Sequence, residues 1–446
     1  MLSESSRDKD KSLTRRRFLK FTGGSLLSLS LPFALSNSAR TASGPLKVGG
    51  IFSLTGPNAP VGKTIEKGAR LAVNRINDGG GIGGEIKLEL VVKDGKTSQT
   101  GASKAARRLV NRGDIGFALG PLIGTHGMAT QPIFGAAKIP QVFFGTVASF
   151  TENHSKYPLS IRYGTRTILQ MAPVIKYLME EREDKQLYLF VPNNQQGRIY
   201  EDVVRKLLER TNGGEVVGVD YYTPFQTDFS PLLTKALNSS ADGVIMGTGI
   251  PADIISVVRQ FDRRGIDKDE FGFYTGQTPN GSVDFERQVL EKGMGDGIIY
   301  AVHYESEDYE RGFKGGRTPS QAKEMEAAFV KKYGHPPVSP PSGSWGWGSM
   351  YILKQAIEGM IERRGKEEVL SLDRRQSLPQ EAISYLLPPS SSSEPGPVMK
   401  TPYGNYGFLS CGQFNIRLGV GTFKGQKHYL LKDRGYGEDL LGPLCS

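Results

Sequence analysis

The segment Val48–Gly84 constrains the fold of this chain more than any other. It opens with an apolar run, turns at Gly56-Pro57, continues with apolar residues at helical spacing, and ends in the glycine-rich stretch Gly79–Gly84. A buried strand, a tight turn, an amphipathic helix and a helix stop account for this order. Because a strand feeding a helix opens a parallel sheet, the segment predicts an α/β domain. It is not a dinucleotide-binding fingerprint, since that places its glycines between the strand and the helix.

The same alternation continues along the chain and predicts parallel sheets with helices on both faces. The expected strands after the first are Ile86–Val92, Ile115–Leu119, Gln141–Phe144, Leu187–Val191, Glu215–Tyr222, Gly243–Met246, Gly272–Thr275 and Gly297–Val302. The expected helices are Gln99–Arg112, Thr125–Ala137, Thr167–Glu183, Gly197–Arg210, Phe229–Asn238, Ala252–Gly265 and Ser344–Glu362. Pro336–Ser342 is expected to be a connection, and Leu387–Pro397 a flexible Pro/Ser loop. Sheets of this kind bind ligands at the carboxyl ends of their strands.

The N-terminal residues indicate an export signal and are set apart from the fold. Residues 1–20 are polar and basic and include Arg15-Arg16-Arg17-Phe18-Leu19-Lys20, and residues 21–35 are apolar. That apolar stretch is too short to span a bilayer, which needs about 20 residues, and the paired arginines favour the twin-arginine (Tat) route. No cysteine follows for a lipid anchor. We expect a Tat signal and leader over residues 1–43 and a soluble protein in the periplasm; a basic amphipathic tail is the alternative.

Composition narrows the classes of function. The net charge is +10, and residues 1–40 carry +5 of it, with eight Lys/Arg against three Asp/Glu. The remaining net charge of +5 is distributed over about 400 residues. Beyond the leader no basic run is interleaved with aromatic residues, so no nucleic-acid partner is expected. The five histidines show no metal spacing, and no nucleophile elbow or Walker A loop is present. We therefore expect no metal, no cofactor and no enzymatic activity.

The sequence leaves the roles of two pairs of residues undecided. Cys411 and Cys445 are the two cysteines of the sequence, and they either pair in an oxidising compartment or remain free thiols. Trp345 and Trp347 lie two residues apart at the start of an expected helix. They either pack in the core or line a ligand site.

An ordered set of motifs identifies a family. The motifs are Ser53-Leu54-Thr55-Gly56-Pro57, Gly68-Ala69-Arg70, Leu119-Gly120-Pro121, Asn193-Asn194-Gln195-Gln196-Gly197 and Thr227-Asp228-Phe229-Ser230. In this order they resemble the periplasmic receptors of branched-chain amino-acid ABC transporters, the Leu/Ile/Val-binding family. The resemblance covers roughly Leu46–Arg364. It implies a type I periplasmic binding-protein fold, with two doubly wound parallel-sheet lobes joined by a three-strand hinge.

The resemblance also implies how the chain is divided between the lobes. Residues 46–163 and 302–410 are expected to form lobe 1, and residues 164–301 with roughly 411–446 to form lobe 2. The chain would cross between them near Ile161–Thr165, Gly297–Val302 and Phe408–Phe423.

In this family lobe 1 holds the carboxylate of a solute with hydroxyl groups and with backbone N–H groups at a helix N-terminus. The matching segments contain Thr125 and His126 in one place and Gly145 and Thr146 in another. Thr125 would offer its hydroxyl and His126 its backbone N–H, and Gly145 would let the backbone approach the solute beside Thr146. The alternatives are that Thr125 only caps its own helix and that Gly145-Thr146 is an ordinary turn.

The matching positions of lobe 2 are Gln196, Gln277 and Thr278, and here the chain departs from the family. The family often has a tyrosine where this chain has Gln196, and an acid that pairs with the ammonium of an amino acid where this chain has Gln277 and Thr278. An unpaired buried ammonium is costly, so we expect a ligand other than an ordinary α-amino acid. Asp228 and Asp253 are expected to be helix caps and not substitutes for that acid.

The function implied by the resemblance is that of an extracytoplasmic receptor. It would capture a small polar or carboxylate-bearing solute, such as an amino acid, an amide or a related compound, by closing its lobes. It would deliver the solute to the membrane permease subunits of an ABC importer. The alternatives are a Tat-exported, cofactor-dependent enzyme and a sensory ligand-binding module.

Overall fold

The computed structural model describes residues 44–146, 154–211, 213–276, 282–302, 309–311, 320–337, 340–392, 394–402, 404–436 and 440–441. The expected Tat signal and leader, residues 1–43, lie outside the described residues. All described residues belong to one unit, Arg40–Ser446.

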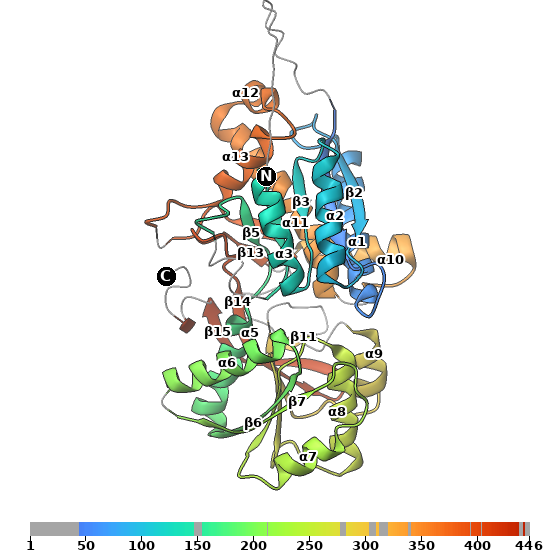
Figure 1. The fold of residues 1–446 in the computed structure, drawn as a ribbon. Helices are drawn as coiled ribbons and strands as arrows, with labels where there is room; N and C mark the ends of the chain where they lie inside the picture. The colour runs from blue at the N-terminus through green and yellow to red at the C-terminus, as the bar shows by residue number, and fades with distance from the viewer. Residues whose placement is uncertain are drawn as a thin grey trace, which may run out of the picture. The chain divides into compact units, whose positions relative to one another are not determined.

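The first sheet consists of five parallel strands in the order β2-β1-β3-β4-β5 (Figure 1). The strands are β1 (Leu46–Phe52), β2 (Leu88–Asp94), β3 (Phe117–Leu119), β4 (Gln141–Phe143) and β5 (Ser160–Arg162). The parallel sheet predicted from the alternating pattern is confirmed. Of these five strands only β5 was not predicted, because its sequence Ser160-Ile161-Arg162 contains a single apolar residue and so no apolar run.

Helices cover both faces of the first sheet. On one face lie α2 (Gln99–Asn111) and α3 (Gly124–Ala136), which bury small and aliphatic side chains against β1 and β3. On the other face lie α1 (Ala59–Asp78) and α11 (Pro340–Arg364). These two helices pack closely because glycines face the partner backbone: a Cβ on Gly346 would lie 2.7 Å from the nitrogen of Ala69.

The second sheet has eight strands in the order β11-β15-β14-β10-β9-β8-β6-β7. Its parallel strands are β6 (Gln186–Pro192), β7 (Glu215–Tyr222), β8 (Gly243–Met246), β9 (Gly272–Thr275) and β10 (Ile298–Val302). One face is covered by α5 (Thr167–Tyr177), its π-helical extension η1 (Leu178–Arg182), and α6 (Gln195–Thr211). The other is covered by α7 (Ser230–Leu237), α8 (Pro251–Arg263), α9 (Val283–Phe285) and η2 (Glu286–Leu290). The helices predicted from periodicity here agree within a few residues.

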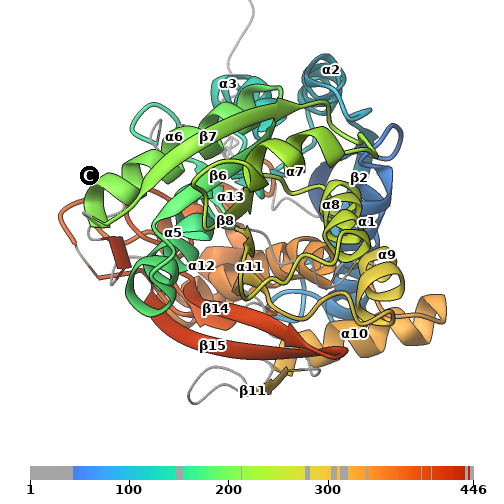
Figure 2. The same ribbon diagram turned by 90° about the horizontal axis from the view of Figure 1, so that it is seen from below.

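Two long strands complete the second sheet and were not predicted. They are β14 (Arg417–Lys424) and β15 (Lys427–Tyr436), which run antiparallel to each other and lie side by side in Figure 2. β14 is also antiparallel to β10, and β11 (Tyr309–Arg311) pairs with β15. The expectation of purely parallel sheets is therefore wrong for this edge. The two residues Gly425-Gln426 between the strands form a hairpin turn, in which Gly425 adopts φ 60°.

Residues 303–319, which follow β10, lie largely outside the described residues. Two described stretches connect the sheets: residues 163–166 lead from β5 to α5, and residues 407–416 lead into β14. The last stretch runs beside the first, since Arg162 and Gln413 form a β-bridge and the backbone N–H of Arg162 donates to the carbonyl of Gly412 at 2.7 Å. The lobe boundaries themselves stay a prediction.

The remaining elements pack on the first sheet's side of the chain. They are α10 (Ser320–Tyr333), α12 (Lys366–Ser371), α13 (Ser377–Leu386) and the hairpin β12 (Met399–Thr401) with β13 (Gly404–Tyr406). The proline-rich connection was predicted to reach Ser342, but α11 begins at Pro340, because proline is tolerated in the first helical turn. Within the expected loop 387–397, the backbone N–H of Gly396 donates to Phe408 at 2.7 Å. Cys411 is disulfide-bonded, and Cys445 lies outside the described residues.

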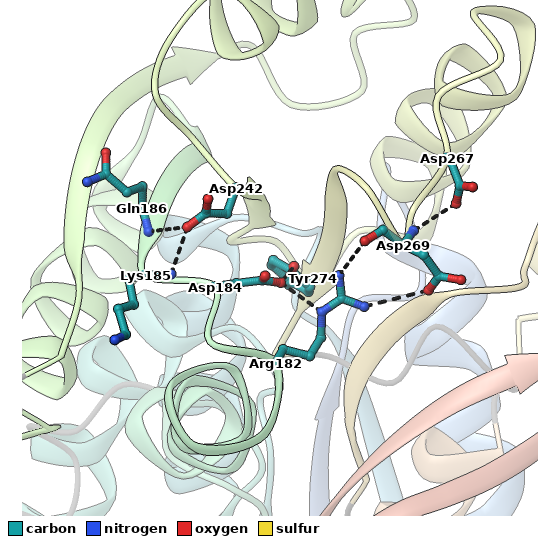
Figure 3. A network of polar contacts seen from close by, with 8 residues as sticks. All are labelled: Arg182, Asp184, Lys185, Gln186, Asp242, Asp267, Asp269 and Tyr274. Atoms are coloured by element: carbon teal, nitrogen blue, oxygen red, sulfur yellow. Dashed lines mark hydrogen bonds and ion pairs between the residues drawn. The ribbon is translucent and has the colours of Figure 1, made fainter.

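A polar network ties together the amino ends of the central strands of the second sheet (Figure 3). Arg182 donates from Nε to Asp184 at 2.7 Å, and the hydroxyl of Tyr274 donates to the same carboxylate. Asp242 accepts the backbone N–H groups of Lys185 and Gln186 at 2.8 and 2.7 Å. This edge is opposite the carboxyl ends of the strands, where parallel sheets with helices on both faces generally bind ligands, so the network serves the fold. Of the helices that the structure describes, none combines the length and apolar character of a membrane span.

Candidate functional site

The carboxyl ends of β1, β3 and β4 lie along one edge of the first sheet, where the predicted lobe 1 residues follow them. Asp94 organises the loop after β1: it accepts the backbone N–H of Leu54 at 2.9 Å and the hydroxyl of Thr55 at 2.6 Å. Partial burial raises the pKa of Asp94, but these hydrogen bonds and that from Lys96 outweigh it and hold the pKa below its ordinary value. The carboxylate therefore stays charged and fixes the loop.

Thr125 and His126 lie in the first turn of α3. The N-cap position is Ile123, and the helix begins at Gly124, so Thr125 does not cap it. The backbone N–H of His126 donates to Ile123 at 3.0 Å and is not available to a ligand, which corrects the prediction. The helix starts one residue earlier than predicted, so its unpaired first N–H groups fall on Gly124 and Thr125. Neither has a backbone acceptor within the described part of the chain.

The imidazole of His126 is buried at 6% exposure. Burial lowers its pKa to about 4, because desolvation penalises the charged form. His126 is therefore neutral near pH 7, and its imidazole adds no charge to the positive character of the N-terminus of α3.

Gly145 joins the end of β4 to the loop that precedes α3. A Cβ at this position would overlap both the carbonyl oxygen of Leu122 and Cζ of the Phe143 ring, so only glycine allows this close approach. The carbonyl of Gly145 accepts a hydrogen bond from Nη1 of Arg162, a fully buried arginine on β5 whose guanidinium lies 5.2 Å from the Phe143 ring centroid. Arg162 was not singled out in the sequence, where an arginine within a short strand carries no distinctive signal.

Thr146 and Gln196 are brought together, although they come from different sheets. Nε2 of Gln196, at the start of α6, donates to Oγ1 of Thr146 at 3.3 Å and to Oγ1 of Thr167 at 3.4 Å. Thr167, the first residue of α5, also donates its backbone N–H to the carbonyl of Thr146 at 3.1 Å. Thr167 is the one member of this group that the sequence did not suggest. The group thus links the carboxyl edge of the first sheet to a helix of the second.

The other predicted residues are placed as follows. Gln277 and Thr278 lie outside the described residues, just after β9. Asp228 accepts the backbone N–H of Ser230 at 2.9 Å, as a residue beside a helix start does. Asp253 is not a cap: its carboxylate accepts the hydroxyl of Tyr222 at 2.9 Å and the backbone N–H of Phe225 at 2.8 Å.

No carboxylate among the described residues forms a hydrogen bond with Thr125, Thr146 or Gln196. Likewise, no group of three or more His, Cys, Asp or Glu side chains within the described ranges could hold a metal ion. The described edge therefore offers hydroxyl groups, an amide and the N-terminus of α3. Such groups suit an oxygen-bearing or anionic solute.

Comparison with known proteins identifies the family of the chain. Residues 45–372 match the family model described as periplasmic binding protein, so the chain belongs to that family of solute-binding proteins. The Leu/Ile/Val-binding protein BraC3 of Rhizobium johnstonii is 32% identical over 212 residues, which span 47% of this chain and 56% of BraC3.

Solved structures share the fold. The substrate-binding protein LivJ from Streptococcus pneumoniae, in complex with isoleucine, has a TM-score of 0.69 at 19% identity and covers 87% of this chain and 100% of its own. A solute-binding protein from R. palustris, in complex with 4-hydroxybenzoate, also has a TM-score of 0.69, at 18% identity, and covers 90% of this chain and 98% of its own. The predicted fold class, a type I periplasmic binding protein, is confirmed.

Proposed function

We propose that this protein is the receptor of an ABC importer and that it captures a small solute bearing a carboxylate or another polar oxygen group. The observation that carries the proposal is the hydrogen bond between Gln196 and Thr146. It brings a helix of the second sheet onto the carboxyl edge of the first, where a solute held from both sides would lie. Closure of two lobes around the solute would then present a joint surface to the permease subunits.

In this proposal the solute's negative oxygens meet the free N–H groups at the start of α3 and the hydroxyl groups of Thr125 and Thr146. Gln196 contacts the solute from the other side, together with Gln277 and Thr278 after β9. The role is one of binding and not of catalysis. The two solved neighbours carry isoleucine and 4-hydroxybenzoate, and the absence of a paired acid at the described positions favours the second kind of ligand over an amino acid.

Export is part of the proposal. Arg15-Arg16-Arg17-Phe18-Leu19-Lys20 would direct the folded chain through the Tat translocase to the periplasm. Replacing Arg15, Arg16 and Arg17 with lysine should leave the precursor in the cytoplasm, as cell fractionation would show. Unimpaired export of this variant would argue against the Tat route.

The test of the receptor function is ligand-dependent thermal stability of the purified mature protein. A panel of amino acids, amides and aromatic carboxylates is added one by one, and at 100 times its Kd a bound solute should stabilise the native state by about 2.7 kcal/mol. A rise in Tm with one compound, diminished in the variant Gln196→Met, supports the proposal. No rise with any compound, or a stoichiometric chromophore or metal in the purified protein, would favour an enzyme instead.

A further inference from the structure

Half-buried apolar side chains lie along the carboxyl edge of the first sheet, beside the polar groups described above. Leu54 follows β1, Val61 lies in the first turn of α1, and Leu122 follows β3. All three pack against the core of this sheet, as does Trp345 in the second turn of α11. The carbonyl of Leu122 also contacts Gly145. The edge thus presents apolar surface next to hydroxyl groups.

Trp345 lies against the residue that leads into Gly145-Thr146. Its indole stacks on the ring of Phe144, with ring centroids 6.1 Å apart and an interplanar angle of 12°. Phe144 follows β4 directly and is fully buried, whereas Trp345 keeps part of its surface exposed. Because Phe144 directly precedes Gly145-Thr146, the indole packs against the segment that leads into the edge where the proposed ligand lies.

The indole also carries a donor that lacks an acceptor. Nε1 of Trp345 is buried, and no hydrogen-bond partner exists for it among the described residues. A buried donor left unpaired is unfavourable, and an indole N–H is a donor only, so an acceptor oxygen next to it would be stabilising. Trp347, two residues further on, also has an unpaired Nε1, but it is fully buried and stacks on Tyr351 within the same helix. It serves as an internal reference.

We infer that Trp345 is a specificity-determining residue that forms an aromatic wall of the ligand site and donates from Nε1 to an oxygen of the ligand. The ligand class is a small aromatic carboxylate. Its ring lies along Trp345 and Leu122, its carboxylate meets the N–H groups at the start of α3, and no ammonium needs a partner. This inference rests on the proposed receptor function and narrows its ligand.

The two tryptophans of the chain make the inference measurable by intrinsic fluorescence. The mature protein is titrated with two probes, 4-hydroxybenzoate and isoleucine, and affinity is measured independently by calorimetry. The variant Trp347→Phe leaves Trp345 as the sole reporter, and Trp345→Phe keeps an aromatic ring but removes the donor. A thermal melt of each variant without probe establishes that it is folded, and the wild-type titration serves for comparison if Trp347→Phe is not.

The expected result is that 4-hydroxybenzoate changes the emission of the wild type and of Trp347→Phe but not of Trp345→Phe. Trp345→Phe should also bind the probe about tenfold or more weakly, because a buried oxygen of the ligand would lose its hydrogen-bond donor. Binding of 4-hydroxybenzoate with equal affinity by wild type and Trp345→Phe would overturn the inference and leave the receptor function intact. Binding of isoleucine alone would do the same, and binding of neither probe would overturn the ligand class.

Discussion

Gly272 should tolerate no side chain while Tyr274 is present. A Cβ on Gly272 would overlap the hydroxyl group and Cζ of Tyr274 and lie 2.6 Å from Cε1, and a Cβ on the neighbouring Gly243 would lie 2.7 Å from Cε2 of the same ring. The tyrosine ring thus lies flat over two glycines of adjacent strands, and its hydroxyl is held by Asp184 (Figure 3). The substitution Gly272→Ala must therefore displace the ring.

The free-energy cost of displacing the Tyr274 ring is the sum of the packing contacts and the hydrogen bond that the ring loses. Tyr274 is fully buried, and removing a buried aromatic ring from a core typically costs about 3–5 kcal/mol. The lost hydrogen bond to the Asp184 carboxylate adds about 1.5–3 kcal/mol, while partial retention of contacts by the displaced ring and the smaller entropy of an unfolded alanine offset part of the sum. We expect Gly272→Ala to lower the free energy of unfolding by about 3–5 kcal/mol.

A double-mutant cycle measured by urea unfolding isolates the ring as the cause. In the background Tyr274→Ala, Gly272→Ala should cost nothing or stabilise by about 0.5 kcal/mol, so that the coupling energy exceeds about 2 kcal/mol. Gly213→Ala is the matched control, since its Cβ would meet only the flexible side chain of Met179 and a carbonyl, each at 3.4 Å. Equal costs of Gly272→Ala with and without Tyr274 would refute this packing argument.

Three further outcomes are expected. Burial raises the pKa of Asp253, so its charge begins to destabilise the native state as pH rises above the unfolded pKa of about 3.9. Asp253→Asn can still bond Tyr222, and its free energy of unfolding at pH 7 should lie within about 1 kcal/mol of that of the wild type. Asp253→Ala should lower the free energy of unfolding by about 2–3 kcal/mol. Burial lowers the pKa of His428, which bonds the Tyr300 hydroxyl at 2.8 Å, to about 4. The native imidazole is neutral, so its contribution to the free energy of unfolding is complete above pH 6.5 and is lost as pH falls towards 4. The urea midpoint should therefore fall less steeply between pH 7 and pH 4 in His428→Asn than in the wild type. Gln196→Met should cost about 0.5–1.5 kcal/mol without ligand, as loss of neutral hydrogen bonds does, and a change in unfolding free energy near zero would show that its bond to Thr146 is not formed.

The sequence predicted the parallel strands and the helices that cover them, because each buried strand appears in the sequence as a short run of apolar residues. It missed β14 and β15, whose pairing with β10 depends on a return of the chain from residues more than 100 positions away. Local periodicity cannot reveal such a partner. The π-helical end of α5 likewise reads as ordinary helix in the sequence.

The candidate site was predicted in part. Thr146 and Gln196 were identified as facing positions, and the structure places them within hydrogen-bond distance. The error at His126 arose from a helix that begins one residue earlier than its pattern suggests, which moves the free N–H groups onto Gly124 and Thr125. Thr167 and Arg162 could not have been found, since their roles depend on contacts with Thr146 and Gly145 that only the folded chain creates.

A crystal structure of the mature protein with the compound that raises its Tm most tests the proposed ligand site directly. We expect the compound between Thr146 and Gln196, with its acidic oxygens at the start of α3. A ligand bound elsewhere, with the Gln196–Thr146 contact undisturbed, would show that the solute is not captured at this edge.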